Sequence, residues 1–326
     1  MVNRLSINYL LDRTVSDRED TQQVIQQLQN TPKSIPPRYF YDRQGSLLFE
    51  QICQLPEYYP TRTEASILEQ YAPEIIDRTQ GVELVELGSG SSTKTRYLLD
   101  RYQYLDRFCY YTPIDVSDSI LKSSAEKLLQ EYPQLKINAN VATYSQALAK
   151  LATYSLGKRL IIFLGSSIGN FSSSECDRFI AEVGSALNTG DYFLLGIDLQ
   201  KPQTILESAY NDAQGITAAF NLNMLQHLNH RFQGNFDLDC FRHRAIYNSE
   251  KQQIEMYLIS QKPQAVTLKA LDLTINLESQ EAILTEISRK FALPQMAQYL
   301  TGYGLNTVST YSDRQNWFGL LLAQKK

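Results

Sequence analysis

The segment Val82–Lys94 constrains the fold of this chain more than any other stretch. Its first half, Val82–Leu87, is a short apolar run with the β-branched enrichment of a buried strand. The second half opens with the turn Gly88-Ser89-Gly90, which leads into a helical pattern through Leu98 and Leu99. Glycine suits such a turn because a residue without Cβ lets the backbone turn tightly and approach a bound ligand closely. The segment therefore predicts a strand, a glycine turn and a helix.

The residues around this turn favour a nucleoside over a dinucleotide as the ligand. A dinucleotide fold calls for a third glycine at position 93, where this chain has Thr93. The next apolar run predicts a second strand that ends on Asp115, an acid placed to accept hydrogen bonds from a ribose diol. One Gly-x-Gly turn with an acid at the next strand end is the usual pattern of a class I S-adenosylmethionine methyltransferase. The alternative is a structural glycine turn beside a solvated aspartate.

Helices and strands alternate along the chain on both sides of this segment. A helix is expected from Thr63 to about Asp77, and the later elements are expected as helices over 118–131, 144–151 and 174–187 and strands over 135–141, 159–165 and 190–198. This alternation predicts an α/β fold with a Rossmann-like, doubly wound parallel sheet, whose ligands lie beyond the carboxyl ends of the strands. A carboxyl-terminal helix and two strands, over 293–302, 305–310 and 317–323, resemble the end of class I methyltransferase sheets, in which the last strand is antiparallel.

The alternation breaks between residues 200 and 290. Two expected helices, Ile205–Asp212 and Ile216–Asn229, precede alternating strands between 235 and 277. The polar residues 1–30 are expected to form an entry helix, and the aromatic-rich residues after them either pack against a neighbouring domain or form the wall of a pocket. We predict a methyltransferase domain of residues 63–199 and 291–326, and a discontinuous α+β substrate-binding domain of residues 1–62 and 200–290.

The composition suits a cytoplasmic protein that binds small molecules. The chain has 326 residues, of which 43% are hydrophobic, and a net charge of −4 without any basic block. We therefore expect neither nucleic acid nor a membrane as a partner, and we expect a monomer. No run approaches the length of a membrane span, and no export signal is evident. The cysteines show no C-x-x-C spacing and are expected to be free thiols in a reducing cytosol: Cys53, Cys109, Cys176 and Cys240.

Two of the three histidines, His227 and His230, have a spacing that metal sites use on a helix. No third ligand is near them in the sequence. We therefore predict that the protein binds no metal ion.

Long motifs occur in the order found in one family of enzymes. The chain resembles the histidine Nα-methyltransferases of ergothioneine biosynthesis over nearly its full length. The motifs that carry this resemblance are Tyr41-Asp42-x-x-Gly45-Ser46-x-Leu48-Phe49, Leu55-Pro56-Glu57-Tyr58-Tyr59-Pro60-Thr61-Arg62, Glu86-Leu87-Gly88-Ser89-Gly90, Phe163-Leu164-Gly165-Ser166-x-Ile168-Gly169-Asn170 and Leu284-Thr285-Glu286-Ile287-Ser288.

The resemblance implies which residues hold each substrate. S-adenosylmethionine, which would leave as S-adenosylhomocysteine, would be held by Gly88, Lys94, Asp115, Thr143 and Tyr144. L-histidine and its mono- and dimethylated forms would be held by Tyr58, Asn170, Tyr210, Glu286 and Ser288, with Tyr41, Phe49, Gly165 and Met256 lining the site. Tyr41 is the candidate catalytic residue, as a hydrogen-bond partner of the substrate amine.

One position departs from the family pattern. Where the family has an acid followed by an aromatic residue near the adenine, this chain has Thr143 and Tyr144. Thr143 can accept a hydrogen bond only through its hydroxyl, whereas Tyr144 can still stack on the adenine. Taken without the resemblance, Lys94 also fits a solvated helix lysine, and Glu286 fits an acid on a helix surface.

The resemblance implies three methyl transfers to the α-amine of L-histidine, which give hercynine in the first step of ergothioneine biosynthesis. Asn170 and Tyr210 offer neutral donors to the substrate carboxylate, and Glu286 and Ser288 can bind both imidazole nitrogens if their segment is extended or ends a helix. Two rival functions stay open. One is methyl transfer to another amino acid, such as a tryptophan derivative, and the other is a non-catalytic nucleoside-binding or sensor module.

Overall fold

The computed structural model describes residues 4–11 and 13–326, which form two compact units. The first unit contains residues 4–11, 62–199 and 291–326. The second unit contains residues 13–61 and 200–290. The chain thus passes between the units more than once, and each unit has a sheet of its own.

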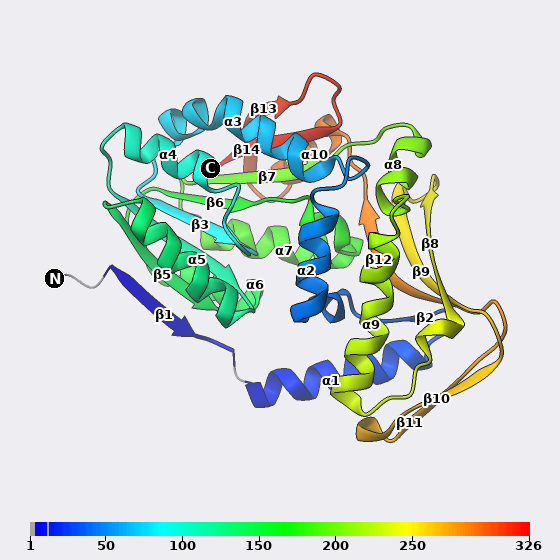
Figure 1. Ribbon diagram of the computed structural model, residues 1–326. Helices are drawn as coiled ribbons and strands as arrows, with labels where there is room; N and C mark the ends of the chain where they lie inside the picture. The colour runs from blue at the N-terminus through cyan, green and yellow to red at the C-terminus, as the bar shows by residue number, and fades with distance from the viewer. Residues whose placement is uncertain (1–3, 12) are drawn as a thin grey trace. The chain divides into compact units, whose positions relative to one another are not determined.

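The first unit is built on one eight-stranded sheet (Figure 1). Its strands are Leu5–Tyr9 (β1), Glu83–Leu87 (β3), Cys109–Asp115 (β4), Leu135–Val141 (β5), Arg159–Phe163 (β6), Tyr192–Asp198 (β7), Leu305–Ser312 (β13) and Phe318–Lys325 (β14). The order is β1-β5-β4-β3-β6-β7-β14-β13, so the chain steps outward from β3 in both directions. The strands from β1 to β7 are parallel, whereas β14 is antiparallel to both of its neighbours. The predicted doubly wound sheet with an antiparallel last strand is confirmed.

Helices cover both faces of this sheet. Side chains alternate between the faces along each strand. Leu84 of β3 belongs to the core under α3 (Pro60–Thr79), α4 (Arg96–Tyr104) and α5 (Asp118–Glu131). Val85 belongs to the opposite core, under α6 (Tyr144–Leu151), α7 (Ser173–Ala186) and α10 (Leu293–Thr301). Because both faces are covered, β3, β6 and β7 are buried along their whole lengths.

The amino terminus differs from the sequence-based prediction. The sequence predicts an entry helix over residues 1–30 in the substrate-binding domain, but Leu5–Tyr9 forms strand β1 at the edge of the first unit's sheet. This strand pairs in parallel with β5, with Leu5 opposite Ile137. Arg4 strengthens the pairing, because its guanidinium donates hydrogen bonds to the main-chain oxygens of Leu129 and Tyr132. The helix that follows, α1, spans Arg13–Gln29.

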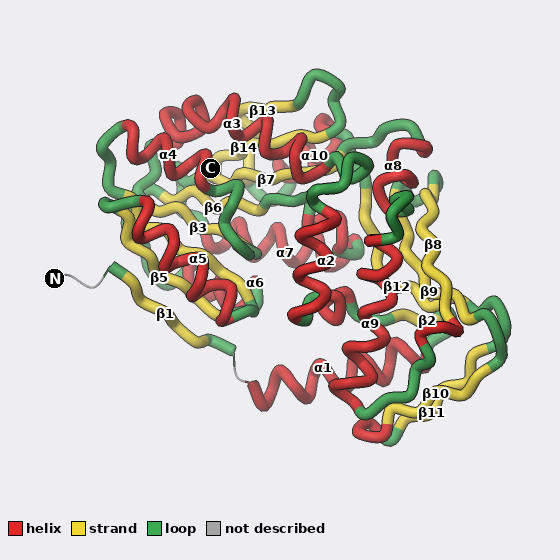
Figure 2. The backbone as a smooth tube through the Cα atoms, in the orientation of Figure 1, coloured by secondary structure: helices red, strands yellow, loops and turns green. Residues whose placement is uncertain are grey.

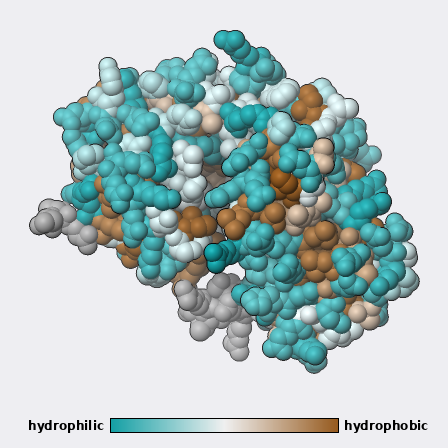
Figure 3. Space-filling model, viewed as in Figure 1, coloured by the Kyte–Doolittle hydropathy of each residue, from teal (hydrophilic) through white to brown (hydrophobic). Residues whose placement is uncertain are grey.

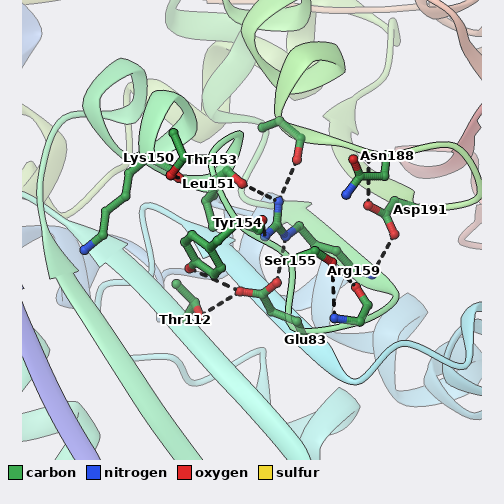
Figure 4. Close-up of polar contacts among 12 residues, drawn as sticks. Glu83, Thr112, Lys150, Leu151, Thr153, Tyr154, Ser155, Arg159, Asn188 and Asp191 are labelled. Carbon is green, nitrogen blue, oxygen red and sulfur yellow. Dashed lines mark hydrogen bonds and ion pairs between the residues drawn. The ribbon is translucent and has the colours of Figure 1, made fainter.

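A buried ion pair joins the amino ends of β3 and β6 (Figure 4). Arg159 Nε lies 2.8 Å from Glu83 Oε2, and neither side chain is more than 1% exposed. The other guanidinium nitrogens donate to the main-chain oxygens of Leu151, Tyr154 and Ala186. Together with the bond to Glu83, these bonds engage all three guanidinium nitrogens of Arg159, as a buried charge pair requires. Glu83 and Arg159 are also partners in the β3–β6 ladder, so the ion pair and the ladder specify the same register.

Replacing Arg159 by methionine should destabilise the protein strongly, because Glu83 would stay buried without a counter-charge. We expect the free energy of unfolding, measured by chemical denaturation, to fall by about 3–5 kcal/mol. Arg96→Met is the matched control, since it breaks the partly exposed pair with Glu131 and should cost no more than about 1 kcal/mol. Equal losses in the two variants would contradict a special role for the buried pair.

The second unit has an α+β architecture. Its four-stranded sheet has the order β2-β12-β9-β8, and a separate hairpin pairs β10 with β11. The strands are Lys33–Ser34 (β2), Phe241–Asn248 (β8), Gln253–Ser260 (β9), Gln264–Leu268 (β10), Leu273–Leu277 (β11) and Ala282–Arg289 (β12). The helices are α1, Arg43–Ile52 (α2), Gln203–Tyr210 (α8) and Ile216–Phe232 (α9), and α9 packs on α2 and on β8 and β9 (Figure 2).

The motif around Gly45 has a steric cause. A Cβ at this position would lie 1.7 Å from the main-chain oxygen of Phe40, so only glycine fits. The Gly45 N–H donates to Asp42 Oδ1 at 2.7 Å, which caps the start of α2. Asn223 of α9 donates to the same oxygen at 2.9 Å. These contacts fix the backbone beside Tyr41.

Strand β12 contains a β-bulge at Thr285. In its ladder with β9, Leu284 is opposite Tyr257 and Glu286 is opposite Met256, which leaves Thr285 as the extra residue. The Thr285 hydroxyl donates to the main-chain oxygen of Met256 at 3.0 Å. A bulge redirects the side chains that follow it. Beyond the bulge the strand is regular, so Glu286 and the residue two positions later point to the same face.

The face drawn in Figure 3 is mostly hydrophilic, and apolar side chains gather there only in limited patches. Within residues 4–11 and 13–326, no helix combines the length and the apolar composition needed to cross a membrane.

Candidate functional site

The glycine turn after β3 is held by a carboxylate from the neighbouring strand. Gly88 and Gly90 have positive φ angles of 71° and 48°, which glycine adopts without a Cβ penalty. The Gly90 N–H donates to Asp115 Oδ2 at 3.0 Å, and the Ser117 N–H donates to Oδ1 at 2.9 Å. A carboxylate has about four lone-pair sites, so the half-buried Asp115 can accept further hydrogen bonds from a ligand at the carboxyl end of β4.

Tyr144 contacts the same turn from α6. A Cβ at Gly88 would lie 2.8 Å from Tyr144 Oη, so the two residues can approach this closely only because position 88 is glycine. The Tyr144 ring packs edge-on against Phe163 and Phe179, with centroid distances of 5.4 and 6.0 Å. These contacts fix the orientation of an aromatic ring beside the glycine turn.

Thr143 caps a helix, a structural role that the family resemblance does not suggest. It is the N-cap of α6, where its hydroxyl accepts a hydrogen bond from the Gln146 N–H and donates one to Gln146 Oε1. Because the hydroxyl proton is used in this capping box, Thr143 can offer a ligand only a lone pair. The geometry accounts for Thr143 as a stabiliser of the helix that carries Tyr144. Its contact with adenine stays a prediction.

Lys94 is paired with an acid that sequence reasoning missed. Its Nζ forms an ion pair with Glu64, which is fully buried. Both Glu64 oxygens also accept the N–H of Gly165, at 2.8 and 2.9 Å. One carboxylate therefore connects the residues before α4 to the turn after β6, and Lys94 is not a simple solvated lysine. Glu64 lies two positions after the motif that ends at Arg62, which is the signal that could have identified it.

The turn after β6 presents Asn170 at the carboxyl edge of the sheet. Ser166 has a positive φ of 56°, and its hydroxyl accepts the N–H of Asp198 at 2.8 Å. One turn of 3-10 helix, Ser167–Asn170, follows and ends on the half-buried Asn170. The Asn170 amide makes no hydrogen bond with the part of the chain that the structure describes. Its donors and its acceptor are thus available to a ligand.

Predicted substrate residues in the second unit form a continuous row of aromatic rings. Tyr41 lies edge-on to Phe49, Phe49 to Tyr58, and Tyr58 to Tyr210, with centroid distances of 5.8, 6.3 and 6.1 Å. Phe220 of α9 supports Tyr41 and Phe49, with centroids 5.9 Å from each. Burial, followed by the neighbouring Tyr210, raises the pKa of Tyr58 well above its usual value. Tyr58 is therefore a neutral hydroxyl at physiological pH.

The row continues to strand β12 through Ser288. Tyr210 Oη donates to Ser288 Oγ at 2.9 Å. Glu286 lies two residues earlier on the same face of the strand, in an extended conformation and not on a helix. Met256, its partner across the ladder, is buried.

The carboxylate of Glu286 is available to accept a hydrogen bond from a ligand. Glu286 is half-buried, and burial raises its pKa to about 7, while the positive charge of Lys290 acts in the opposite direction. Among residues 4–11 and 13–326, none donates a hydrogen bond to this carboxylate. Partial burial of a carboxylate without a hydrogen-bond donor costs free energy, and a ligand N–H that donates to it can offset this cost.

The structure thus brings the predicted residues together in two sets, one in each unit. The first unit carries Gly88, Lys94, Asp115, Thr143, Tyr144, Gly165 and Asn170, and the second carries Tyr41, Phe49, Tyr58, Tyr210, Met256, Glu286 and Ser288. Sequence reasoning missed Glu64 and Lys290. Each is a single charged residue that lies just outside the quoted motifs, and the sequence alone does not reveal its hydrogen-bond partners.

The histidines and cysteines show no metal-binding arrangement in the described ranges. Within them, no cluster of three or more His, Cys, Asp or Glu side chains could hold an ion. His227 Nδ1 is 2.9 Å from the main-chain oxygen of Tyr39, as suits a histidine with a structural role. None of the four cysteines, all of which lie in the described ranges, forms a disulfide; three of them are buried and Cys53 is half-buried.

Comparison with known proteins decides the family. A family model described as histidine-specific methyltransferase, SAM-dependent, matches residues 20–325. The chain belongs to this family. The histidine N-alpha-methyltransferase of Mycobacterium tuberculosis is 41% identical over 91% of this chain and 92% of its own length. That of Mycolicibacterium smegmatis is 43% identical over 90% of each chain, and the ergothioneine biosynthesis protein 1 of Schizosaccharomyces pombe is 26% identical over 86% of this chain and 37% of its own.

Membership of this methyltransferase family confirms the resemblance that the sequence motifs indicate. It also identifies the cofactor, because the family depends on S-adenosylmethionine (SAM). The roles of the individual residues in this methyltransferase stay predictions.

Replacing Asp115 by alanine should weaken SAM binding. The loss of an acceptor for the ribose hydroxyls and for the Gly90 N–H should cost about 1.5–3 kcal/mol, or roughly 10- to 150-fold in Kd by calorimetry. Asp118→Ala is the control, because Asp118 bonds to Tyr9 and Lys122 instead of the turn. Unchanged affinity in Asp115→Ala would remove Asp115 from the SAM site.

Proposed function

We propose that the protein transfers three methyl groups from SAM to the α-amino group of L-histidine and so forms hercynine. The family match and the histidine N-alpha-methyltransferases similar to this chain support histidine as the acceptor. The observation that carries the proposal is the half-buried carboxylate of Glu286, which no described residue satisfies, beside Ser288 on one face of β12. A neutral imidazole offers one N–H and one lone pair, and these two side chains can bind both.

The first unit has residues that fit SAM. The turn at Gly88 and Gly90 lets the ligand approach the backbone, and the spare lone pairs of Asp115 suit a ribose diol. We assign Tyr144, which lies beside Gly88, to the adenine, and Lys94, which pairs with Glu64, to the carboxylate of the methionine portion. When bound, SAM supplies an electrophilic methyl group on its sulfonium, so the protein has to orient the reactants more than to activate the methyl.

The acceptor needs donors for its carboxylate and a partner for its amine. We assign Asn170 and Tyr58 as neutral donors to the carboxylate, with Gly165 and Met256 lining the site. Tyr210 shares the carboxylate role in the sequence-based prediction. In the structure its proton is donated to Ser288, so Tyr210 must redirect its hydroxyl if it is to donate to the carboxylate.

Three transfers require the amine to lose a proton each time before it attacks. The Tyr41 hydroxyl, on a side chain that is 49% exposed, is a hydrogen-bond partner for this nitrogen and can pass the proton to water. The nitrogen gains a permanent positive charge in the last transfer. The rings of Phe49 and Tyr58 favour such a cation through their faces and exclude water from it.

A methyltransferase of a tryptophan derivative is the nearest alternative. An indole has one donor and no acceptor, so it would leave the Ser288 hydroxyl without a partner. A non-catalytic nucleoside-binding module is the other alternative. It would bind SAM but give no methylated product.

We further propose that the protein acts as a cytoplasmic monomer and without a metal ion. Attack of an amine on a sulfonium methyl neither generates an oxyanion nor requires an activated water, so positioning alone can account for the chemistry. The net charge of −4 also gives no attraction to nucleic acid or to anionic lipid.

Incubation of the enzyme with SAM and a panel of amino acids, followed by mass spectrometry, tests the proposed function. We expect histidine to gain one, two and then three methyl groups, and the other amino acids to gain none or far fewer. Methylation of tryptophan or a derivative in preference to histidine would contradict the proposal. SAM binding in calorimetry without any methylated product would favour the non-catalytic module.

Replacing Glu286 by alanine should lower kcat/KM for histidine by about 10- to 150-fold, because the imidazole N–H loses its acceptor in a largely dry site. Phenylalanine and tryptophan should gain relative to histidine, since they no longer have to desolvate a carboxylate. Glu281→Ala is the control, because Glu281 pairs with Lys33 just before β12 begins. A proportional loss for every amino acid would refute imidazole binding by Glu286 even if methyl transfer survives.

A further inference from the structure

Lys290 is a buried cation that the proposed function leaves without a task. It is 3% exposed and directly follows β12. Its Nζ donates to Ser288 Oγ at 2.8 Å and to Tyr210 Oη at 3.2 Å, and it lies 5.0 Å from the centroid of the Tyr210 ring. Lysine is almost never buried unless it is paired. The burial of a lysine directly after the strand that carries Glu286 therefore suggests a functional role.

The first consequence of Lys290 concerns the hydroxyl of Ser288. An ammonium group has three donors and no acceptor, so Ser288 Oγ must accept from Lys290. Ser288 Oγ also accepts from Tyr210 Oη at 2.9 Å. A hydroxyl has two lone pairs and one proton, and both lone pairs are now occupied. The proton of Ser288 engages no residue in the described part of the chain, so Ser288 meets a ligand as a donor.

The second consequence concerns Glu286. Burial raises the pKa of Glu286 to about 7, and the charge of Lys290 opposes this rise. Lys290 therefore favours the ionised carboxylate, which only accepts hydrogen bonds. The ammonium of Lys290 thus favours Ser288 as a hydrogen-bond donor and Glu286 as an acceptor, on one face of β12.

Three tyrosines and one acid lie around this set. Tyr58 faces Glu286, and Tyr247 of β8 faces Lys290; burial raises the pKa of each, so both are neutral near pH 7. Tyr210 of α8 contacts Lys290 through its hydroxyl and its ring. Glu255 of β9 is opposite Ile287 in the ladder, and so points to the other face of the sheet.

We propose that Lys290 is a positioning residue that sets the hydrogen-bond polarity of the ring subsite, with Ser288 as its donor and Glu286 as its acceptor. This inference rests on the proposed function. The subsite then binds a neutral imidazole, which has one lone pair and one N–H. It disfavours an imidazolium, which has two donors, and an indole, which has no acceptor. Lys290 thereby selects the protonation state of the methyl acceptor as well as its ring.

The test compares Lys290→Met with the wild type and with Lys33→Met. Methionine keeps the unbranched apolar stem and removes the charge, and Lys33 is a partly buried lysine of the same unit, 2.6 Å from Glu281. The measurements are kcat/KM for histidine as a function of pH, and the inhibition constant of phenylalanine as a competitor of histidine. Phenylalanine reports on packing, because its ring neither donates nor accepts a conventional hydrogen bond.

In Lys290→Met we expect kcat/KM for histidine to fall on the order of 10-fold or more, and the inhibition constant of phenylalanine to change little. The acid limb of the histidine profile should move to higher pH, because Glu286 loses the charge that lowers its pKa. Lys290→Arg keeps the charge and the donors, and should recover part of the activity. Lys33→Met should leave the profile in place.

Equal weakening of histidine and phenylalanine, or an unshifted acid limb, would overturn the role of Lys290. Lys290→Gln, which is neutral but polar, supplies the same comparison if the methionine variant does not fold. Failure of the proposed function would look different, because the wild type itself would then methylate no histidine at any pH. An active wild type with an unaffected Lys290→Met would refute only the polarity role.

Discussion

The buried ion pair between Glu83 and Arg159 sets the starting point of the two central strands of the first unit. Both β3 and β6 are five residues long, so a register fixed at their amino ends is carried directly to the turns at their carboxyl ends. A slip of one residue would turn the side chains of β3 to the wrong faces and move Gly88 away from Tyr144. The ion pair at the amino ends of β3 and β6 thus helps to fix the positions of the glycine turns at their carboxyl ends.

Two fully buried charged side chains of the first unit, Arg159 and Glu64, are satisfied by other residues of that unit. Arg159 is bonded to Glu83 and to main-chain oxygens, and Glu64 is bonded to Lys94 and to the Gly165 N–H. In the described part of the chain, the Glu286 carboxylate and the Asn170 amide make no such bonds. Groups that stability does not use are the groups that a ligand can use, and both lie among the residues that the family resemblance implies.

Much of the first unit could be predicted from local pattern. The bounds of β5, α5 and α6 agree with the sequence-based ranges, because apolar period and the turns between these elements point to the same ends. Strand β1 could not be predicted, since five residues give little periodicity and their partner β5 is distant in the sequence. The bulge at Thr285 and the contact of Lys290 with Tyr210 could not be predicted either, because each depends on a partner distant in the sequence. Glu64 lies beside a motif, but its bonds to Lys94 and Gly165 are not apparent from the sequence. The substrate residues came from the resemblance to a family and not from spacing alone.

The central claim is that histidine is held as a neutral imidazole between the Ser288 donor and the Glu286 acceptor. Nitrogen NMR of ring-labelled histidine, bound to the enzyme with S-adenosylhomocysteine, tests this claim most directly, because it distinguishes protonated from unprotonated ring nitrogens. The account predicts one N–H and one bare nitrogen in a single tautomer, at pH values where free histidine is partly imidazolium. A doubly protonated ring in the complex, or a tautomer mixture like that of free histidine, would contradict it.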